Sequence, residues 1–213
     1  NNKDKISICL KNITVEVDRN TGLIVYLGKN GKQILAESGR SLDHSFIGKE
    51  KTYVAEQHFA SPSNEHQYGL GQFQDGYLDV RGLSRRLTQV NTQISIPMIL
   101  SNKGYGLLWN NYGLVDFNPS DNNVTLKKNA EGGDVTEVNV TTTAGNKKER
   151  RESNVFEADV NIDKEGDYSF LLDVGQKMAR KLNLEIDGHR LMNMENLWLP
   201  PTSSVIAHLS AGI

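Results

Sequence analysis

Cysteine is almost absent from this sequence, since Cys9 is the only one among 213 residues. A single cysteine cannot form an intrachain disulfide, so cysteine usage does not indicate the redox compartment. Cys9 lies in the alternating run KISICL, where we expect it to be a small buried residue. Long hydrophobic runs are also missing, because no stretch approaches the roughly 18 apolar residues of a membrane-spanning helix. The sequence therefore predicts no membrane span.

The chain also lacks an excess of charge of either sign. The formal net charge is −2, with 23% charged and 37% hydrophobic residues, a composition typical of a soluble, folded protein. Near-neutrality argues against a nucleic-acid partner and against a polybasic membrane patch. The beginning, NNKDKISI, contains neither methionine nor a signal peptide, and we interpret it as a mature or trimmed end.

Common catalytic and cofactor motifs are missing as well. No Walker lysine motif, paired histidine ligands or G-x-S-x-G motif is present, and GLGQFQDG lacks the parallel strand and helix of a dinucleotide site. We therefore predict no cofactor and no metal. Sugar hydrolysis needs two carboxyl groups held roughly 5 to 10 Å apart. No sequence rule pairs the candidates, and we assign none of them a catalytic role: Glu65, Asp75, Asp79 and Asp116.

Helix signals are sparse, and what the sequence does contain is β-strand periodicity. Alternating apolar residues in KISICL, ITVEV and LIVYL predict an antiparallel meander, with a type I′ hairpin turn at Asn30-Gly31. We expect surface loops over 36–64 and further strands from 85 onward. Pro97 predicts an edge strand or a bulge. KMARKLNLE could form a short helix, although it lies between strand-like segments.

A change of composition divides the chain. KKNAEGG and AGNKKERRES, between residues 128 and 152, are rich in Gly, Asn and charge, and KKERRE is typical of a solvated loop. We therefore predict two all-β domains. The first, 1–130, is an antiparallel β-sandwich, and the second, 131–213, is a partial β-sandwich or barrel module.

Amides, glycines and aromatics are concentrated in 65–82, EHQYGLGQFQDGYLDVRG, and in the segment that follows. Glycines allow close backbone approach, amides both donate and accept hydrogen bonds, and aromatic rings offer flat apolar faces. This combination suits a neutral, polyhydroxylated ligand. The same residues could equally brace the edge of a β-sandwich or an interface with another domain.

These motifs resemble the N-terminal β-sandwich of glycoside hydrolase family 31, a galactose-mutarotase-like fold. The resemblance covers about residues 6–128 and rests on YGLGQ, DGYLDVRG and LTQVNTQISIPMILSNKGYGLLWNN. Ser101, Gly104, Tyr105, Gly106 and Asn110 or Asn111 occupy the positions of its S-x-x-GYG-x-x-x-x-N pattern. In that family a (β/α)₈ barrel carries the catalytic aspartates, and nothing after residue 128 resembles it. The resemblance therefore implies a non-catalytic part of a retaining enzyme, whose partner is the barrel of the same polypeptide.

The second unit resembles a protective-antigen-type (PA-14-like) module. The matching residues are Gly166, Tyr168, Phe170, Ile186, Asp187, Gly188, Trp198 and Pro200. Its insertion into the sandwich is similar to α-xylosidases of the Bacteroidetes type. That similarity implies xyloglucan-type or α-glucan oligosaccharides as partners, and a periplasmic or cell-surface location.

The resemblance places TQVNTQ at the rim of the sugar pocket, where many relatives carry an aspartate. It implies substrate contact by Gln89, Asn91 and Gln93, and we add Gln72 and Trp109 as candidate binding residues. The leading hypothesis is an accessory region of an α-xylosidase or α-glucosidase. A free-standing carbohydrate-binding or adhesion module is the alternative. A ligand-free interaction domain would be favoured by burial of Tyr77 and Trp109 with no concave face left.

Overall fold

The computed structural model describes residues 3–91, 93–173, 182–194 and 202–211. None of these residues is helical, and every strand pair is antiparallel. The predicted all-β, antiparallel fold is therefore confirmed. Over the same residues, no helix exists that is long and apolar enough to cross a membrane.

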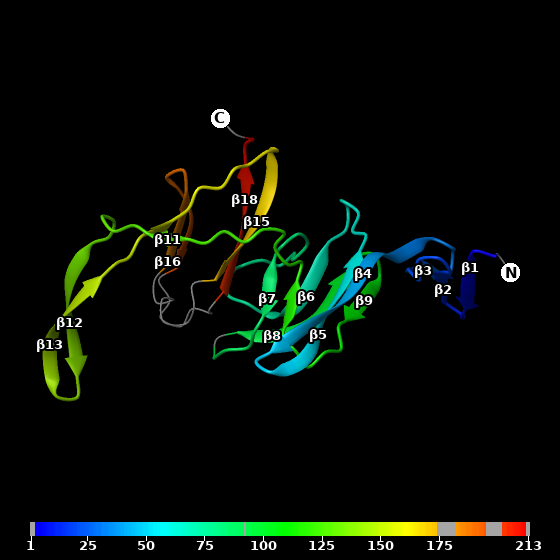
Figure 1. Ribbon diagram of the computed structural model, residues 1–213, viewed down its shortest axis with the longest axis horizontal. Coiled ribbons are helices and arrows are strands. Elements are labelled where there is room, and N and C mark those ends of the chain that lie inside the picture. Colours follow the sequence, from blue (N-terminus) through cyan, green and yellow to red (C-terminus); the bar gives the residue numbers. More distant parts are fainter. Residues whose placement is uncertain (1–2, 92, 174–181, 195–201, 212–213) are drawn as a thin grey trace.

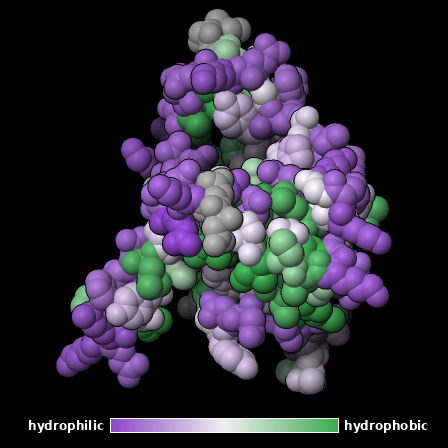
Figure 2. Space-filling view, turned by 90° about the vertical axis from the view of Figure 1, so that its right-hand side faces the viewer, coloured by the Kyte–Doolittle hydropathy of each residue, from purple (hydrophilic) through white to green (hydrophobic). Residues whose placement is uncertain are grey.

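The N-terminal third is a five-stranded meander, shown in blue and cyan in Figure 1. Its strands, each paired with the next, are β1 (Lys5–Cys9), β2 (Ile13–Asp18), β3 (Ile24–Gly28), β4 (Gln33–Ile47) and β5 (Glu50–Phe59). The register places Ile8, Val15 and Tyr26 side by side on one apolar face. Figure 2, which looks onto the N-terminal end, shows hydrophobic side chains gathered there.

Three expectations for this region were wrong. Cys9 is exposed, because β1 is an edge strand. The turn after β3 is not type I′, since Gly31 has φ = +72° whereas Asn30 is not in the positive-φ region that type I′ requires. Residues 36–64 are mostly strand, because β4 and β5 form a long hairpin rather than surface loops.

The central part of the chain contains two smaller sheets that enclose the core. Strands β6 (Gln67–Gln72), β8 (Ile94–Ser101) and β9 (Tyr105–Leu108) form one, and β7 (Arg85–Leu87) and β10 (Val115–Phe117) form the other. Leu70, Val80, Leu83 and Ile99 are buried together between them. Half-buried apolar side chains complete this core: Phe73, Tyr77, Leu87, Leu107, Phe117 and Ile206.

Pro97 lies at an irregularity of the central strand β8. The register between β6 and β8 shifts between Gly69 and Gly71, opposite the proline. Since β8 is paired on both sides, the bulge alternative for Pro97 is correct and the edge-strand alternative is wrong. Pro97 has no N–H to donate, but its carbonyl accepts a 2.8 Å hydrogen bond from the backbone amide of Trp109, which follows β9.

Within the described residues, the C-terminal part contains four antiparallel pairs. They are β11 (Lys127–Lys128) with β14 (Phe156–Glu157), β12 (Val135–Thr142) with β13 (Gly145–Glu152), β15 (Gly166–Asp173) with β18 (Thr202–Leu209), and β16 (Leu182–Ile186) with β17 (His189–Met194). KKERRE is therefore a strand rather than a loop, although it is fully exposed on the hairpin at the far left of Figure 1. The candidate helix KMARKLNLE lies partly outside the described residues, and from Leu182 it is strand.

Strand β18 packs against the central core although it belongs to the predicted second domain. The Ile206 amide donates a 3.0 Å hydrogen bond to the Tyr77 hydroxyl, and the Ser204 hydroxyl donates one of 2.5 Å to the carbonyl of Ser84. Ser169 on β15 accepts a hydrogen bond of 2.8 Å from the Ser84 amide. The boundary at residue 130 stays a prediction, but these contacts join the two sides of it.

Candidate functional site

The described residues 88–91 and 93 form a tight turn between β7 and β8. Val90 and Gln93 exchange two backbone hydrogen bonds of 3.2 Å, which closes the turn. The side chains of Gln89 and Asn91 are exposed on it. The turn therefore presents two amides to solvent, as the predicted rim position requires.

Gln93 has a different environment from the other two amides. Its residue is only 2% exposed, and its Nε2 donates a 2.6 Å hydrogen bond to the carbonyl of Thr88. Its Oε1 is buried and receives no hydrogen bond from the described residues. Gln93 thus ties the two ends of the turn together from the inside, and its predicted contact with substrate stays a prediction.

Beside the turn lies an open hollow of about 220 Å³. Its wall combines amide and hydroxyl groups with apolar patches, from Leu87, Gln89, Ser95, Pro97, Asn111, Gly113 and Val115. Asn111 is held in place by two hydrogen bonds. Its side-chain Oδ1 accepts one of 3.1 Å from the Gly113 backbone amide, and its backbone amide donates one of 2.9 Å to the Trp109 carbonyl. Such a mixed surface can bind the hydroxyls and the apolar face of a sugar ring.

The five predicted binding residues are thus only partly brought together. Gln89 lines the hollow. Half-buried Trp109 does not line it but lies two residues before Asn111, which does. Gln72, which is exposed at the end of β6, pairs with Ile94 at the base of the turn. Asn91 projects from the tip. Sequence reasoning did not select Asn111 for binding, although the motif that carries the resemblance contains it.

The four candidate carboxylates are all engaged by neighbours. Asp75 pairs with buried Arg85, Asp79 lies 2.7 Å from His66 Nδ1, and Asp116 accepts from Arg86 Nε at 2.9 Å. Glu65 accepts hydrogen bonds from two hydroxyls within the sheet that contains β8 and β9. Each therefore has a structural partner.

Glu65 is the most unusual of the four. Burial favours a raised pKa, but hydrogen bonds from Ser101 at 2.5 Å and Tyr105 at 2.6 Å outweigh it, so the pKa of Glu65 lies below its ordinary value. Burial and the bond to this carboxylate raise the pKa of Tyr105 to about 12. Sequence reasoning missed this cluster. The Ser-x-x-Gly-Tyr spacing marked two of its members but gave no sign of their partner.

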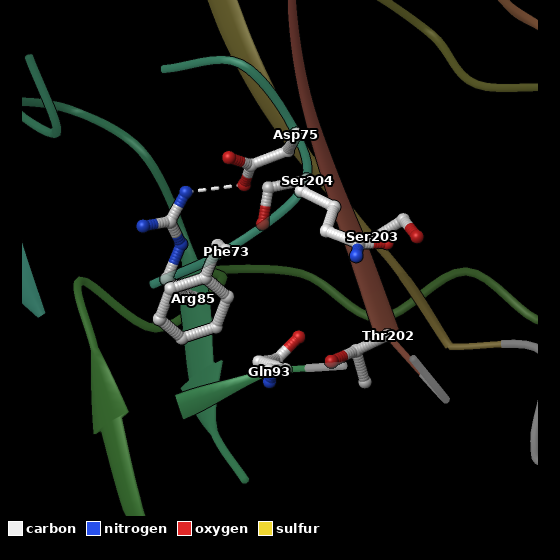
Figure 3. Close-up of a pocket in the computed structure, with 8 residues that line it drawn as sticks. Phe73, Asp75, Arg85, Gln93, Thr202, Ser203 and Ser204 are labelled. Atoms are coloured by element: carbon white, nitrogen blue, oxygen red, sulfur yellow. Dashed lines mark hydrogen bonds and ion pairs between the residues drawn. The ribbon is translucent and has the colours of Figure 1, made fainter. Parts of the chain in front are cut away.

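A small cavity lies behind the turn (Figure 3). Its lining residues are Phe73, Gln74, Asp75, Arg85, Gln93, Thr202, Ser203 and Ser204. Arg85 lies on β7, Phe73, Gln74 and Asp75 follow β6, Gln93 closes the turn, and the last three residues belong to β18. Within the described part of the chain, no group of three or more histidine, cysteine or acidic side chains is arranged to hold a metal ion.

Comparison with known proteins identifies relatives for part of the chain. No sequence profile of a known family matches. An α-xylosidase of Saccharolobus solfataricus is 36% identical over 118 residues, which is 51% of this chain and 16% of that protein. An uncharacterised family 31 glucosidase of Pseudescherichia vulneris is 49% identical over 53 residues, or 25% of this chain and 10% of that protein.

Solved structures support the fold over the whole chain. The family 31 α-xylosidase of Xanthomonas citri superposes with a TM-score of 0.73 and 20% identity, covering 100% of this chain and 27% of its own. At that identity the similarity establishes the fold alone, an all-β architecture. The chain spans between a tenth and about a quarter of the length of these relatives. Over about half of its own length, this chain is homologous to α-xylosidases of glycoside hydrolase family 31.

Proposed function

We propose that this chain is a non-catalytic, N-terminal part of a retaining glycoside hydrolase that acts on α-xylosidic or α-glucosidic linkages. Its role is to supply one wall of the substrate pocket, through the turn 88–93 and the adjoining hollow, and to support a (β/α)₈ barrel elsewhere in the polypeptide. The observation that carries the proposal is the hollow itself, in which Gln89 and Asn111 lie beside apolar Leu87 and Pro97.

The ion pairs made by the candidate carboxylates support the proposal that this chain is non-catalytic. Hydrolysis with retention needs one carboxylate free to attack the sugar and a second free to transfer a proton. Asp75 and Asp116 are instead held in ion pairs with Arg85 and Arg86. We therefore expect no turnover of aryl α-xyloside by the purified chain. Activity that disappears in Asp75→Asn or Asp116→Asn would contradict the proposal.

Binding of xyloglucan oligosaccharides by the hollow is the direct test. One wall of a pocket offers few contacts, so we expect a dissociation constant in about the millimolar range by NMR titration. Each lost hydrogen bond is worth roughly 0.5–1.5 kcal/mol, so Gln89→Ala and Asn111→Ala should each weaken binding about two- to tenfold. Gln33→Ala, which removes a distant exposed amide on β4, is the matched control.

The outcome also separates the two sugar-binding hypotheses. A free-standing carbohydrate-binding module would bind about as tightly alone as within a longer polypeptide. A pocket wall would bind far more tightly when the barrel is present, because the second wall contributes the remaining contacts. Absence of any shift in the hollow residues at saturating oligosaccharide would contradict both.

We infer further that residues 131–213 include a protective-antigen-type module of the kind inserted in Bacteroidetes-type α-xylosidases. The hairpin β16–β17 supports this, because its turn is formed by Asp187 and Gly188, two of the residues that carry the resemblance, with the positive φ values of 48° and 76° that are typical of a type I′ turn. A crystal structure of a longer polypeptide in which these strands belong to a different fold would contradict the inference.

We propose a periplasmic or cell-surface location, which is implied by the same resemblance. Immunoblotting of cell fractions tests it, and detection in the cytoplasmic fraction alone would contradict it.

A further inference from the structure

The cavity behind the turn is small, and seven of the eight residues that line it are polar or charged. It measures about 10 Å³, which is room for about one water molecule. Figure 3 shows Arg85, Asp75 and Phe73 on one side, Gln93 below, and the β18 residues opposite. The cavity therefore lies between the base of the turn and a strand that is more than 100 residues away in the sequence.

Two buried atoms of the residues that line this cavity have no hydrogen-bond partner among the described residues: Arg85 Nε and Gln93 Oε1. One is a donor and the other an acceptor. A buried polar group without a partner costs about 1–3 kcal/mol, so each requires an explanation. A molecule that both accepts and donates would satisfy the two atoms together.

Charge and size identify that molecule. The guanidinium of Arg85 is already neutralised by Asp75, and its Cζ lies 4.0 Å from the centroid of the Phe73 ring. A second anion would face the Asp75 carboxylate at short range, which disfavours it. The volume excludes anything much larger than water. The chemistry therefore favours one neutral water molecule.

The side chain of Gln93 connects this cavity to the exposed amides. Its Nε2 holds the Thr88 carbonyl, and its backbone closes the turn through Val90. Movement of this side chain would shift the backbone that carries Gln89 and Asn91. Strand β18 limits such movement, since Ser204 and Thr202 form the opposite wall.

We propose that Gln93 is a positioning residue that sets the orientation of the turn, and that one buried water molecule bridges Arg85 Nε and Gln93 Oε1. In this role Gln93 acts on the sugar only through Gln89 and Asn91. The importance of the turn for sugar binding rests on the proposed function, whereas its positioning by Gln93 does not.

The test uses two variants of Gln93, one that loses its hydrogen-bonding groups at every pH and one that regains a donor when it is protonated. Gln93→Met keeps the length of the side chain but removes its donor and acceptor. Gln93→Glu removes the donor while the carboxylate is ionised, and restores both a donor and an acceptor once it is protonated. Burial and the Asp75 carboxylate raise the pKa of such a carboxyl, whereas the Arg85 guanidinium lowers it, so the pKa of the introduced carboxyl is measured first by titrating the variant.

Amide hydrogen exchange of the turn and oligosaccharide affinity are the two measurements. We expect Gln93→Met to speed exchange in the turn about tenfold relative to wild type and to weaken binding. Gln93→Glu should depart from wild type while the introduced carboxyl is ionised and should approach wild type below the pKa measured for that carboxyl. Gln33→Glu, measured at the same pH values, controls for an added charge on an exposed amide of the same type. A merely structural loss would not recover with pH.

Unchanged exchange in the turn of Gln93→Met, or absence of recovery in Gln93→Glu, would overturn the positioning role. A high-resolution crystal structure should show one water between Arg85 and Gln93, and a halide or an empty cavity would overturn that part. If wild type fails to bind oligosaccharide, the proposed function fails, while the exchange comparison still decides the role of Gln93.

Discussion

Glu65 is 2% exposed and holds two strands together through its Oε1 alone. Ser101 ends β8 and Tyr105 begins β9, so the carboxylate accepts one hydroxyl from each side of the intervening turn. Hydrogen bonds to a charged acceptor are worth about 1.5–3 kcal/mol, more than those between neutral groups. Because these hydrogen bonds favour the ionised carboxylate in the folded state, they also lower the pKa of Glu65.

Tyr105→Phe should lower the free energy of unfolding at pH 7 by about 1.5–3 kcal/mol, because it removes one of these bonds. A carboxyl with a depressed folded-state pKa stabilises the fold above its ordinary value of 4.5, and this contribution is lost as pH falls through the folded pKa. The difference between variant and wild type should therefore shrink in acid. Urea unfolding from pH 7 to pH 3 measures it, with exposed Tyr112→Phe as the control. A difference that stays constant with pH would contradict the role assigned to the carboxylate.

At the scale of elements, the backbone of β6 approaches that of β8 so closely at Gly69 and Gly71 that neither position has room for a side chain. A Cβ on Gly71 would lie 2.1 Å from the carbonyl oxygen of Ile94, and one on Gly69 would lie 2.5 Å from that of Met98. Both glycines have positive φ, and so does the buried Leu70 between them. The GLG sequence is therefore required by backbone packing around the Pro97 bulge, and ligand binding is not needed to explain it.

Gly71→Ala should destabilise the chain by about 3 kcal/mol or more, because the new methyl collides with backbone that cannot move independently. Gly76→Ala is the matched control. It shares a positive φ of 81° but has nothing within 4 Å of the added Cβ, so only the conformational cost of about 1–2 kcal/mol applies. Thermal melts of the two variants measure the loss of stability. Equal losses would show that the positive φ, rather than the close approach of β8, accounts for the destabilisation by Gly71→Ala.

Period-two alternation predicted the meander of β1 to β3 correctly, because one face of that sheet is apolar and the other polar. The same rule missed β4 and β5 beyond Gly39, where both faces are largely exposed and alternate less clearly. It also missed β13, whose residues after Gly145 are all polar or charged. Hydrogen bonding to a neighbouring strand stabilises these segments, and composition carries little trace of it.

The sequence and the resemblance indicated where the candidate turn lies but not how its side chains are oriented, and its contact with a sugar stays a prediction. An amide-rich turn following β7 could be located from the sequence, and Gln89 does line the hollow. Gln93 turns inward because the turn is closed by Val90, a backbone arrangement that side-chain periodicity does not encode. Asn111 reaches the hollow from a different loop, and sequence spacing alone does not bring the two loops together.

At the scale of the whole molecule, the core of the central sheets is completed by a strand from the end of the chain. Ile206 joins Leu70, Leu83 and Ile99, and the Tyr77 hydroxyl accepts its backbone hydrogen bond. An ion pair of 3.5 Å between Arg86 and Asp173 adds a link at the surface. The stability of residues 67–117 therefore depends on residues beyond the composition change near 130.

Ile206→Ala should lower the unfolding free energy by about 2–4 kcal/mol and should do so in a single cooperative transition. The control is Ile6→Ala, at a position 44% exposed on the edge strand, where the loss should be below about 1 kcal/mol. Calorimetry distinguishes the alternatives. Two separate transitions, with only the weaker one affected, would mean that the predicted domains 1–130 and 131–213 fold independently.

The hydrogen bond between Tyr77 and Ile206 spans 129 residues of sequence. At a ribosomal rate of about 5–20 residues per second, roughly 6 to 26 seconds separate the synthesis of the two residues. During that interval the nascent chain carries an apolar surface whose native cover has not yet been translated. Chaperone demand in the cell, and inclusion-body formation when translation is slow, should therefore increase with the delay before β18 emerges.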